Sequence, residues 1–360
     1  MIGNTWSRIQ HGIEIASAGV SFALNSLLIF LILRHSPKAL GPYKYLMIYI
    51  SVFELFYSFM DVIVSPIFHS YGSSFLVLMN LKESIFDMET GIMLTSIYCG
   101  CFGSSMAIFG IHFIYRYLVA TGHNLLATFH TWKITIWFMI PMIYGAMWGL
   151  VAYFPLGRTP ESGEHIRSNI METFGWELEE TVYIGAYFYQ EKPNGKYEID
   201  FDSVWGMSVL CFIVGSSFFT IIYFGVKCYS KIRELTPSSK TFKSRALQSH
   251  LFWALCVQTV IPVLLMHVPV TFVNVSALLD RDIGMLGGLV SITIAVYPAV
   301  DPLPTLIIIP HYRKALLNYL CLRSESPETH MDDSKTGQQS RTSATRSTEL
   351  SRSRVATTAF

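Results

Sequence analysis

Ionisable side chains inside otherwise apolar stretches are the residues whose type and position could do chemistry in this chain. Glu54 and Asp61 lie seven residues apart in one such stretch, and Asp301 lies near the end of another. An acid at the centre of a bilayer costs about 2.5–3.5 kcal/mol on insertion scales, so it usually faces protein or water and has a function. Because seven residues make about two helical turns, Glu54 and Asp61 share one helix face. Two interpretations stay open for this pair: functional acids, or neutral, hydrogen-bonded acids that brace a bundle.

The elements that must position these residues are long apolar helices. The 360 residues are 51% hydrophobic and 14% charged, which excludes a disordered chain and disfavours an ordinary soluble domain. Seven stretches can each span a bilayer as a helix: Ile15–Leu33, Tyr45–Phe68, Gly91–Tyr115, Ile134–Phe154, Ser203–Val226, Ala246–Leu279 and Ile283–Ile309. The sequence therefore predicts an all-α membrane protein, a seven-transmembrane helix bundle.

The distribution of Lys and Arg predicts the orientation of the bundle. Most of the 26 basic residues fall after the first, third, fifth and seventh stretches. Since cytoplasmic loops carry the excess of Lys and Arg, we expect the N-terminus outside and the C-terminus in the cytoplasm. None of the six cysteines falls in a predicted outer loop, so we expect no outer disulfide.

The last part of the chain predicts a cytoplasmic attachment and tail. Tyr312–Leu320 has the pattern of a short amphipathic helix on the inner leaflet. Cys321 follows it as a candidate for lipidation, with a free thiol as the alternative. We expect a receptor domain over residues 1–322 and a disordered Ser/Thr/Arg-rich tail over 323–360, with many possible phosphorylation sites.

The longest predicted outer segment, residues 155–202, is acidic and has one strand signal. Thr181–Tyr189 contains three tyrosines and precedes the turn sequence Pro193-Asn194-Gly195, so we expect a short hairpin. The segment could be a lid over the bundle or a solvated spacer, and both interpretations stay open.

The third stretch, from Gly91 to Tyr117, is the predicted centre of the bundle. Small and polar residues interrupt it throughout, which is typical of a helix surrounded by other helices rather than by lipid. At its predicted inner end, Arg116 and Tyr117 are candidate switch residues for coupling, together with Tyr297 and Asp301 on the seventh stretch. Arg116 could form a latch with Asp301, or it could extend to the membrane surface.

Counting inward from the predicted outer face locates a candidate ligand pocket. Small-molecule pockets are mostly apolar, with a few polar groups that orient the ligand. Residues of that character reach similar depths on four stretches: Asp61, Tyr98, Phe102, Ser105, Cys211, Phe212 and His267.

Four motifs in order resemble the nematode serpentine chemoreceptors of class r (str type), the group that includes the nematode diacetyl odorant receptor. They are Gly41–Met47; His112–Tyr117; Ala246-Leu247-Gln248 with Leu251-Phe252 and Gln258–Pro262; and Tyr297-Pro298 with Asp301-Pro302-Leu303. The resemblance covers residues 1–322. It departs from rhodopsin-type receptors where Tyr115 precedes Arg116.

The resemblance implies a G-protein-coupled olfactory receptor in the plasma membrane, on the cilia of sensory neurons. Its implied partners are a small odorant, a heterotrimeric G protein and membrane lipids, with arrestin and kinases at the tail and no nucleic acid. It implies no enzymatic activity, no cofactor and no metal. The alternatives are a channel or transporter, or a metal-dependent membrane hydrolase using His69, His112 or His267. Against them, we find no filter-like loop, no inverted repeat and no shared ligand spacing. The seventh stretch also lacks a Lys that could bind retinal.

Overall fold

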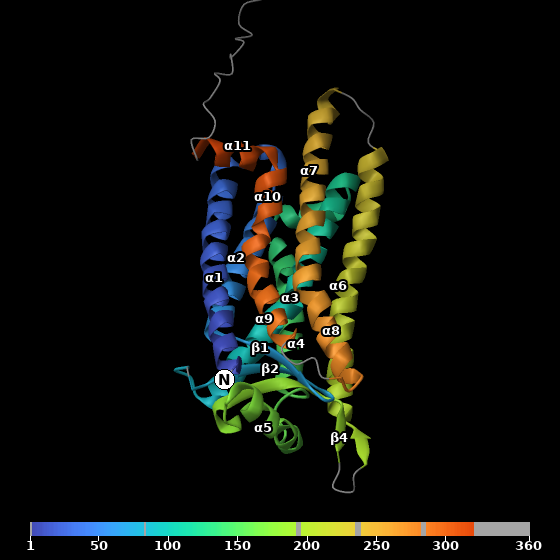
Figure 1. Ribbon diagram of the computed structural model, residues 1–360. Helices are drawn as coiled ribbons and strands as arrows, with labels where there is room; N and C mark the ends of the chain where they lie inside the picture. The colour runs from blue at the N-terminus through green and yellow to red at the C-terminus, as the bar shows by residue number, and fades with distance from the viewer. Residues whose placement is uncertain (1, 83, 192–195, 235–238, 282–285, 320–360) are drawn as a thin grey trace, which may run out of the picture.

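The computed structural model describes residues 2–82, 84–191, 196–234, 239–281 and 286–319. Within these ranges seven helical spans are long and apolar enough to cross a bilayer, which confirms the predicted fold class. They are α1 (Ile2–His35), α2 (Tyr43–Val64), α3 (Met88–Thr121), α4 (Ile134–Tyr153), α6 (Phe201–Glu234), α7 (Ser239–Pro262) with α8 (Val268–Leu278), and α9 (Leu286–Val300) with α10 (Pro302–Ile308). Figure 1 shows them as one bundle. Cys321 and the tail over 323–360 lie outside the described residues.

Proline breaks two of these spans. After Pro262 the sixth span passes through a π-helical turn, η4 (Val263–His267), before α8 begins, because proline removes one backbone hydrogen bond and its ring crowds the preceding turn. The seventh span is interrupted between Val300 and Pro302, so Asp301 lies at the junction of α9 and α10.

Helix α3 runs through the middle of the bundle, as its small residues predict. It packs extensively against α4 and α6, and most of its side chains are buried. Gly100 and Gly145 allow α3 and α4 to approach closely: a Cβ at Gly145 would lie 2.1 Å from the Ser104 hydroxyl oxygen.

A three-stranded antiparallel sheet closes one end of the bundle, which we call the sheet end. Strand β2 (Ser74–Asn80) pairs with both β1 (Ile67–Tyr71) and β3 (Thr181–Tyr187), so that Leu76 lies opposite His69 on one side and Gly185 on the other. The second span is therefore shorter than the predicted Tyr45–Phe68. Ser65 adopts a left-handed conformation (φ 42°) before Pro66, and the residue before a proline disfavours helix.

Residues 155–202 form a packed cap rather than a solvated spacer. Helix α5 (Pro160–Phe174), capped by Thr159, covers β1 and β2 through a buried cluster that includes Ile166, Ile170 and Leu76. The short helix η3 (Leu178–Glu180) leads into β3. The predicted strand forms, but β3 pairs with β2; the hairpin is made by β4 (Tyr189–Glu191) and β5 (Tyr197–Ile199). The predicted turn Pro193–Gly195 lies outside the described residues.

The opposite end, which we call the α11 end, carries the predicted short helix. Helix α11 (Pro310–Tyr319) packs against α1 and α10, with Tyr312 fully buried and its hydroxyl 2.8 Å from the Ser36 hydroxyl. This burial raises the pKa of Tyr312 to about 12. Two short turns, η1 (Lys38–Leu40) and η2 (Asn124–His130), connect helices at this end. The five described cysteines are all free.

Candidate functional site

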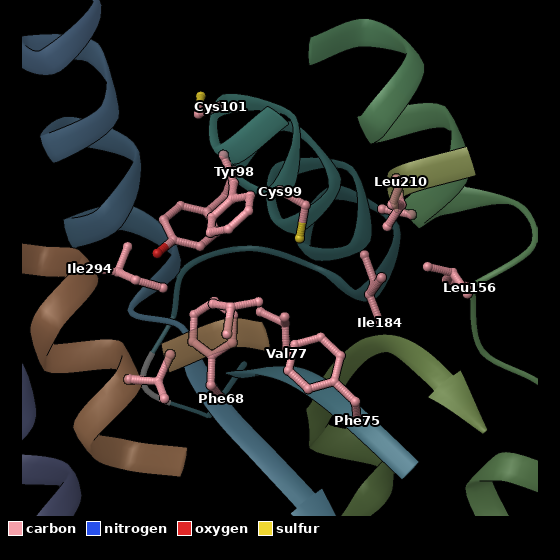
Figure 2. Close-up of a cluster of buried hydrophobic side chains, with 14 of the residues drawn as sticks. Phe68, Phe75, Val77, Tyr98, Cys99, Cys101, Leu156, Ile184, Leu210 and Ile294 are labelled. Carbon is pink, nitrogen blue, oxygen red and sulfur yellow. The ribbon is translucent and has the colours of Figure 1, made fainter. Parts of the chain in front are cut away.

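A cavity of about 700 Å³ lies directly beneath the sheet, between α3, α4, α6 and α8. Its roof is formed by the strands: Phe68 from β1, Phe75 and Val77 from β2, and Ile184 from β3. Figure 2 shows these side chains meeting Tyr98 and Cys99, which project toward them from α3. The volume falls within the usual range for small-molecule sites, and the lining is predominantly apolar.

Aromatic rings form the wall furthest from the sheet. The Phe102 ring centroid lies 5.3 Å from that of Trp148 on α4 and 4.5 Å from that of His267. His267 ends the π-helical turn, so the break after Pro262 decides where its imidazole lies. The His267 side chain is buried and its Nε2 atom has no hydrogen-bond partner. An imidazole nitrogen without a partner is available to a ligand at modest cost, because no existing bond must be broken.

Tyr98 joins the cavity to a polar group behind it. Its ring lines the cavity and packs on Tyr57 of α2, with 5.3 Å between centroids. Its hydroxyl lies beside the carboxyl group of Asp61, which is buried on α2. A ligand that displaces Tyr98 would therefore alter the surroundings of Asp61.

Four of the predicted ligand residues line this cavity: Tyr98, Phe102, Cys211 and His267. The other three do not. Asp61 lies behind Tyr98, and the fully buried Ser105 hydroxyl donates to the Phe102 carbonyl oxygen of its own helix at 2.8 Å. Phe212 is turned out of the bundle, with 74% of its surface exposed. It reaches the predicted depth but lies on the opposite face of α6 from the cavity.

The sequence did not identify the roof residues or Asn274. Asn274 on α8 lines the cavity; its amide donates to the Val270 carbonyl oxygen at 3.0 Å, and its Oδ1 atom is buried without a partner. The signal for the roof was the apolar run Phe75–Met79, which follows the turn residues Gly72-Ser73-Ser74 and a Ser65-Pro66 break.

A network of polar side chains fills the half of the bundle nearer α11. Gln258 on α7 donates to the Asp301 carboxyl and accepts a hydrogen bond from the Thr305 hydroxyl on α10, at 3.3 Å. The carboxyl of Glu54 on α2 interacts with that of Asp301, and both residues are buried. On α1, Asn25 donates to the Pro298 carbonyl oxygen at 3.0 Å. Glu54 and Asp301 thus belong to a network that links four of the seven spans.

Arg116 is held by α7 and α2, not by Asp301. It is 2% exposed; its Nη1 donates to Gln248 Oε1 at 2.9 Å, and its guanidinium carbon lies 3.4 Å from the centroid of the Tyr43 ring. Neither sequence interpretation of Arg116 describes this arrangement, because the side chain neither reaches Asp301 nor extends to the membrane surface. The Nε and Nη2 atoms have no hydrogen-bond partner, which leaves the buried cation incompletely satisfied.

The two remaining candidate switch residues lie in different surroundings. Tyr297 on α9 is fully buried, with its ring 6.2 Å from that of Tyr57 and its hydroxyl without a hydrogen-bond partner. Tyr117 is half-buried, and its ring lies 5.4 Å from that of Phe224 on α6. Among the described residues, no group of three or more His, Cys, Asp or Glu side chains could hold a metal ion.

Known proteins of one family match the chain over nearly its whole described length. The family model "Serpentine type 7TM GPCR chemoreceptor Str" matches residues 10–317. The Caenorhabditis elegans "G-protein coupled receptor str-217" is 36% identical over 315 residues, 87% of this chain and 90% of that protein. "Serpentine receptor class r-10" of the same organism is 29% identical over 326 residues, 91% of this chain and 95% of that protein.

The fold is also that of a solved receptor. The crystal structure of squid rhodopsin superposes with a TM-score of 0.63 over 89% of both chains, at 12% sequence identity, which shows a shared fold. Fold, family model and relatives agree, and the chain belongs to the Str family of serpentine seven-transmembrane chemoreceptors, which are G-protein-coupled receptors.

Proposed function

We propose that this receptor binds a small odorant-like molecule in the cavity beneath the sheet and, when occupied, activates a heterotrimeric G protein at its α11 end. The observation that carries the proposal is the cavity itself: about 700 Å³ of mainly apolar space beneath a folded cap. A ligand of this size is held by apolar contact and oriented by a few polar groups.

The polar groups on the cavity wall limit what the ligand can be. The polar lining side chains include His267, Tyr98, Asn274, Ser208 and Thr271, and none of the described lining residues is Asp, Glu, Lys or Arg. We therefore favour an uncharged ligand with one or two hydrogen-bonding groups. Even the best small ligands gain at most about 1.5 kcal/mol per heavy atom, so affinity depends strongly on each hydrogen bond.

The sixth span offers a route from the cavity to the α11 end. It carries His267 at the cavity wall, Gln258 against Asp301, and Gln248 against Arg116. A ligand that shifts the π-helical turn would favour one of two positions of α7 and so change both contacts. Arg116 and Asp301, with Tyr117 and Tyr297 nearby, are the proposed switch residues.

The orientation of the receptor follows from the proposed function. We propose that the sheet end faces outside and that the α11 end and the tail face the cytoplasm, in the plasma membrane of a sensory cilium. The tail over 323–360 would then meet kinases and arrestin, and Cys321 would be available for lipidation near the inner leaflet.

A ligand screen in cells expressing the receptor tests the proposal. We expect a volatile or small neutral compound to raise calcium or lower cAMP in a dose-dependent manner, and the response to disappear when the G proteins are removed. Ligand-induced currents that persist without any G protein would contradict the proposal and favour a channel.

A further inference from the structure

One side of the cavity wall is incomplete. The strands, α3 and α4 contribute lining residues that are buried or half-buried, whereas every exposed lining residue belongs to α6 or α8. Exposed members of this wall are Val204, Ser208, Cys211 and Gly215 on α6, and Thr271, Val275 and Leu278 on α8. The cavity therefore opens between these two helices.

The spacing of these residues explains the opening. Positions 208, 211 and 215 lie on one helical face, and positions 271, 275 and 278 lie on one face of α8. The side chains at these three α6 positions are small, and a Cβ at Gly215 would meet no atom within 4 Å. Helix α6 packs instead against α3 and α4, and α8 against α9 and the strands.

The opening lies at the depth of the hydrocarbon. Phe212, next to Cys211, and Phe272, next to Thr271, are large apolar side chains with 74% and 56% of their surface exposed. Apolar side chains of this size on the outer face of a membrane-spanning helix face lipid chains. The part of the opening beside Phe212 and Phe272 thus leads to the bilayer.

The sheet covers the cavity at this end of the bundle. Three hydrogen bonds hold the sheet to the helices around the cavity: Gly185 N–H to the Leu156 carbonyl oxygen (2.8 Å), Tyr187 N–H to the Ser203 hydroxyl (3.0 Å) and Phe68 N–H to the Ser291 hydroxyl (3.0 Å). These bonds join the sheet to the segment that follows α4, to α6 and to α9. Helix α5 covers the sheet from outside.

We infer that the ligand enters and leaves laterally, from the bilayer through the opening between α6 and α8, and hence that it is a small apolar compound that dissolves in lipid. This inference rests on the proposed function in taking the cavity as the ligand site. To that function it adds the entry route and the chemical class of the ligand. The concentration of ligand at the cavity is then set by how well the ligand dissolves in the membrane, not by its concentration in water.

The test measures how fast a small apolar molecule reaches the cavity of the purified receptor in lipid nanodiscs. The probe is 3-phenyl-3-(trifluoromethyl)diazirine, flashed with light at set times after mixing, and the readout is the adduct on the peptide that contains Phe102. Gly215→Phe adds a ring at the opening, where a Cβ would meet no atom within 4 Å, and Thr271→Phe adds one at an exposed lining position of α8. Gly19→Phe is the matched control, because Gly19 is an exposed helical glycine on α1 with no atom within 4 Å of a Cβ.

We expect both variants in the opening to slow labelling at least tenfold relative to Gly19→Phe, with a final extent within twofold of the wild type. Equal labelling rates in all variants would overturn the inference. An unchanged rate with a lower final extent would also overturn it, because the ring would then occupy the site rather than its entrance. Rapid labelling by a charged, membrane-impermeant phenyldiazirine would overturn it as well. Labelling needs no agonist or G protein, so a failure here is separate from a failure of the signalling proposal.

Discussion

The two halves of the bundle differ in how their interiors are filled. At the sheet end, aromatic and aliphatic side chains surround about 700 Å³ of space, whereas a cavity lined by Gln258 and Thr305 in the α11 half holds about 10 Å³. In the α11 half, polar side chains from several helices form hydrogen bonds with one another. An apolar cavity can accept a molecule without breaking existing bonds, while a polar network has discrete arrangements that a small helix movement can exchange. The difference is the basis for the proposed division between ligand binding at the sheet end and switching at the α11 end.

The largest expected effect is at the sheet, on which the cavity depends. Gly185→Val would place a Cβ 1.8 Å from the Phe75 carbonyl oxygen, a backbone atom held in the β2–β3 ladder. We expect no folded receptor at the cell surface. The matched substitution Gly19→Val should be expressed normally, as measured by surface labelling. Normal surface expression of Gly185→Val would show that the cap is dispensable for folding.

Arg116→Ala should reduce signalling without affecting ligand binding, and so test the functions of the two halves independently. Its guanidinium contacts Gln248 and Tyr43 at the α11 end, far along α3 from Tyr98. We expect the variant to reach the surface and bind agonist with unchanged affinity, while the maximal G-protein response falls at least tenfold. Arg34→Ala removes an exposed charge at the same end and should signal normally. A full response from Arg116→Ala at matched expression would remove Arg116 from the switch.

Asp301→Ala tests whether the polar network also stabilises the fold. The substitution leaves the buried Gln258 amide without its acceptor, which costs about 1–3 kcal/mol. We expect a lower unfolding temperature in detergent. Asp301→Asn keeps an acceptor and should lose less. If the two variants unfold at the same temperature, the hydrogen bond from Gln258 is not what stabilises this region.

The smallest effect should come from removing the tail. A chain that stops after Arg323 keeps every described element, up to Tyr319. We expect its acute response to match that of the full chain, while desensitisation slows. A lost acute response in a correctly inserted receptor would assign the tail a part in activation.

The helix bundle could be predicted from the sequence because each span is recognised from the hydropathy of its own residues alone. The sheet was harder to predict, since β2 is buried on both faces and so reads as an apolar run without alternation, while β1 contains the buried polar residues His69 and Ser70. The depth of the site was predictable, because a helix rises by a fixed amount per residue. The sequence could not predict which face of each helix meets the cavity: of the neighbouring residues Cys211 and Phe212, only Cys211 lines it.

The contacts that could not be predicted from the sequence join residues that lie far apart in the chain. The contact between Arg116 and Gln248 joins residues 132 apart, and it depends on how α3 and α7 rotate against each other. The charge of Arg116 suggested an acidic partner, but tertiary packing provided an amide and an aromatic ring. Such a choice cannot be read from a local pattern.

The central claim, that the cavity beneath the sheet is the ligand site, is tested most directly by agonist dose–response curves at matched surface expression. His267→Ala, and in parallel Tyr98→Phe, should shift the curve about tenfold to higher concentration, the effect of one lost hydrogen bond of about 1–1.5 kcal/mol. Val268→Ala, at a lipid-facing position beside His267, should leave the curve unchanged. If His267→Ala and Tyr98→Phe both respond like the wild type, the ligand binds elsewhere.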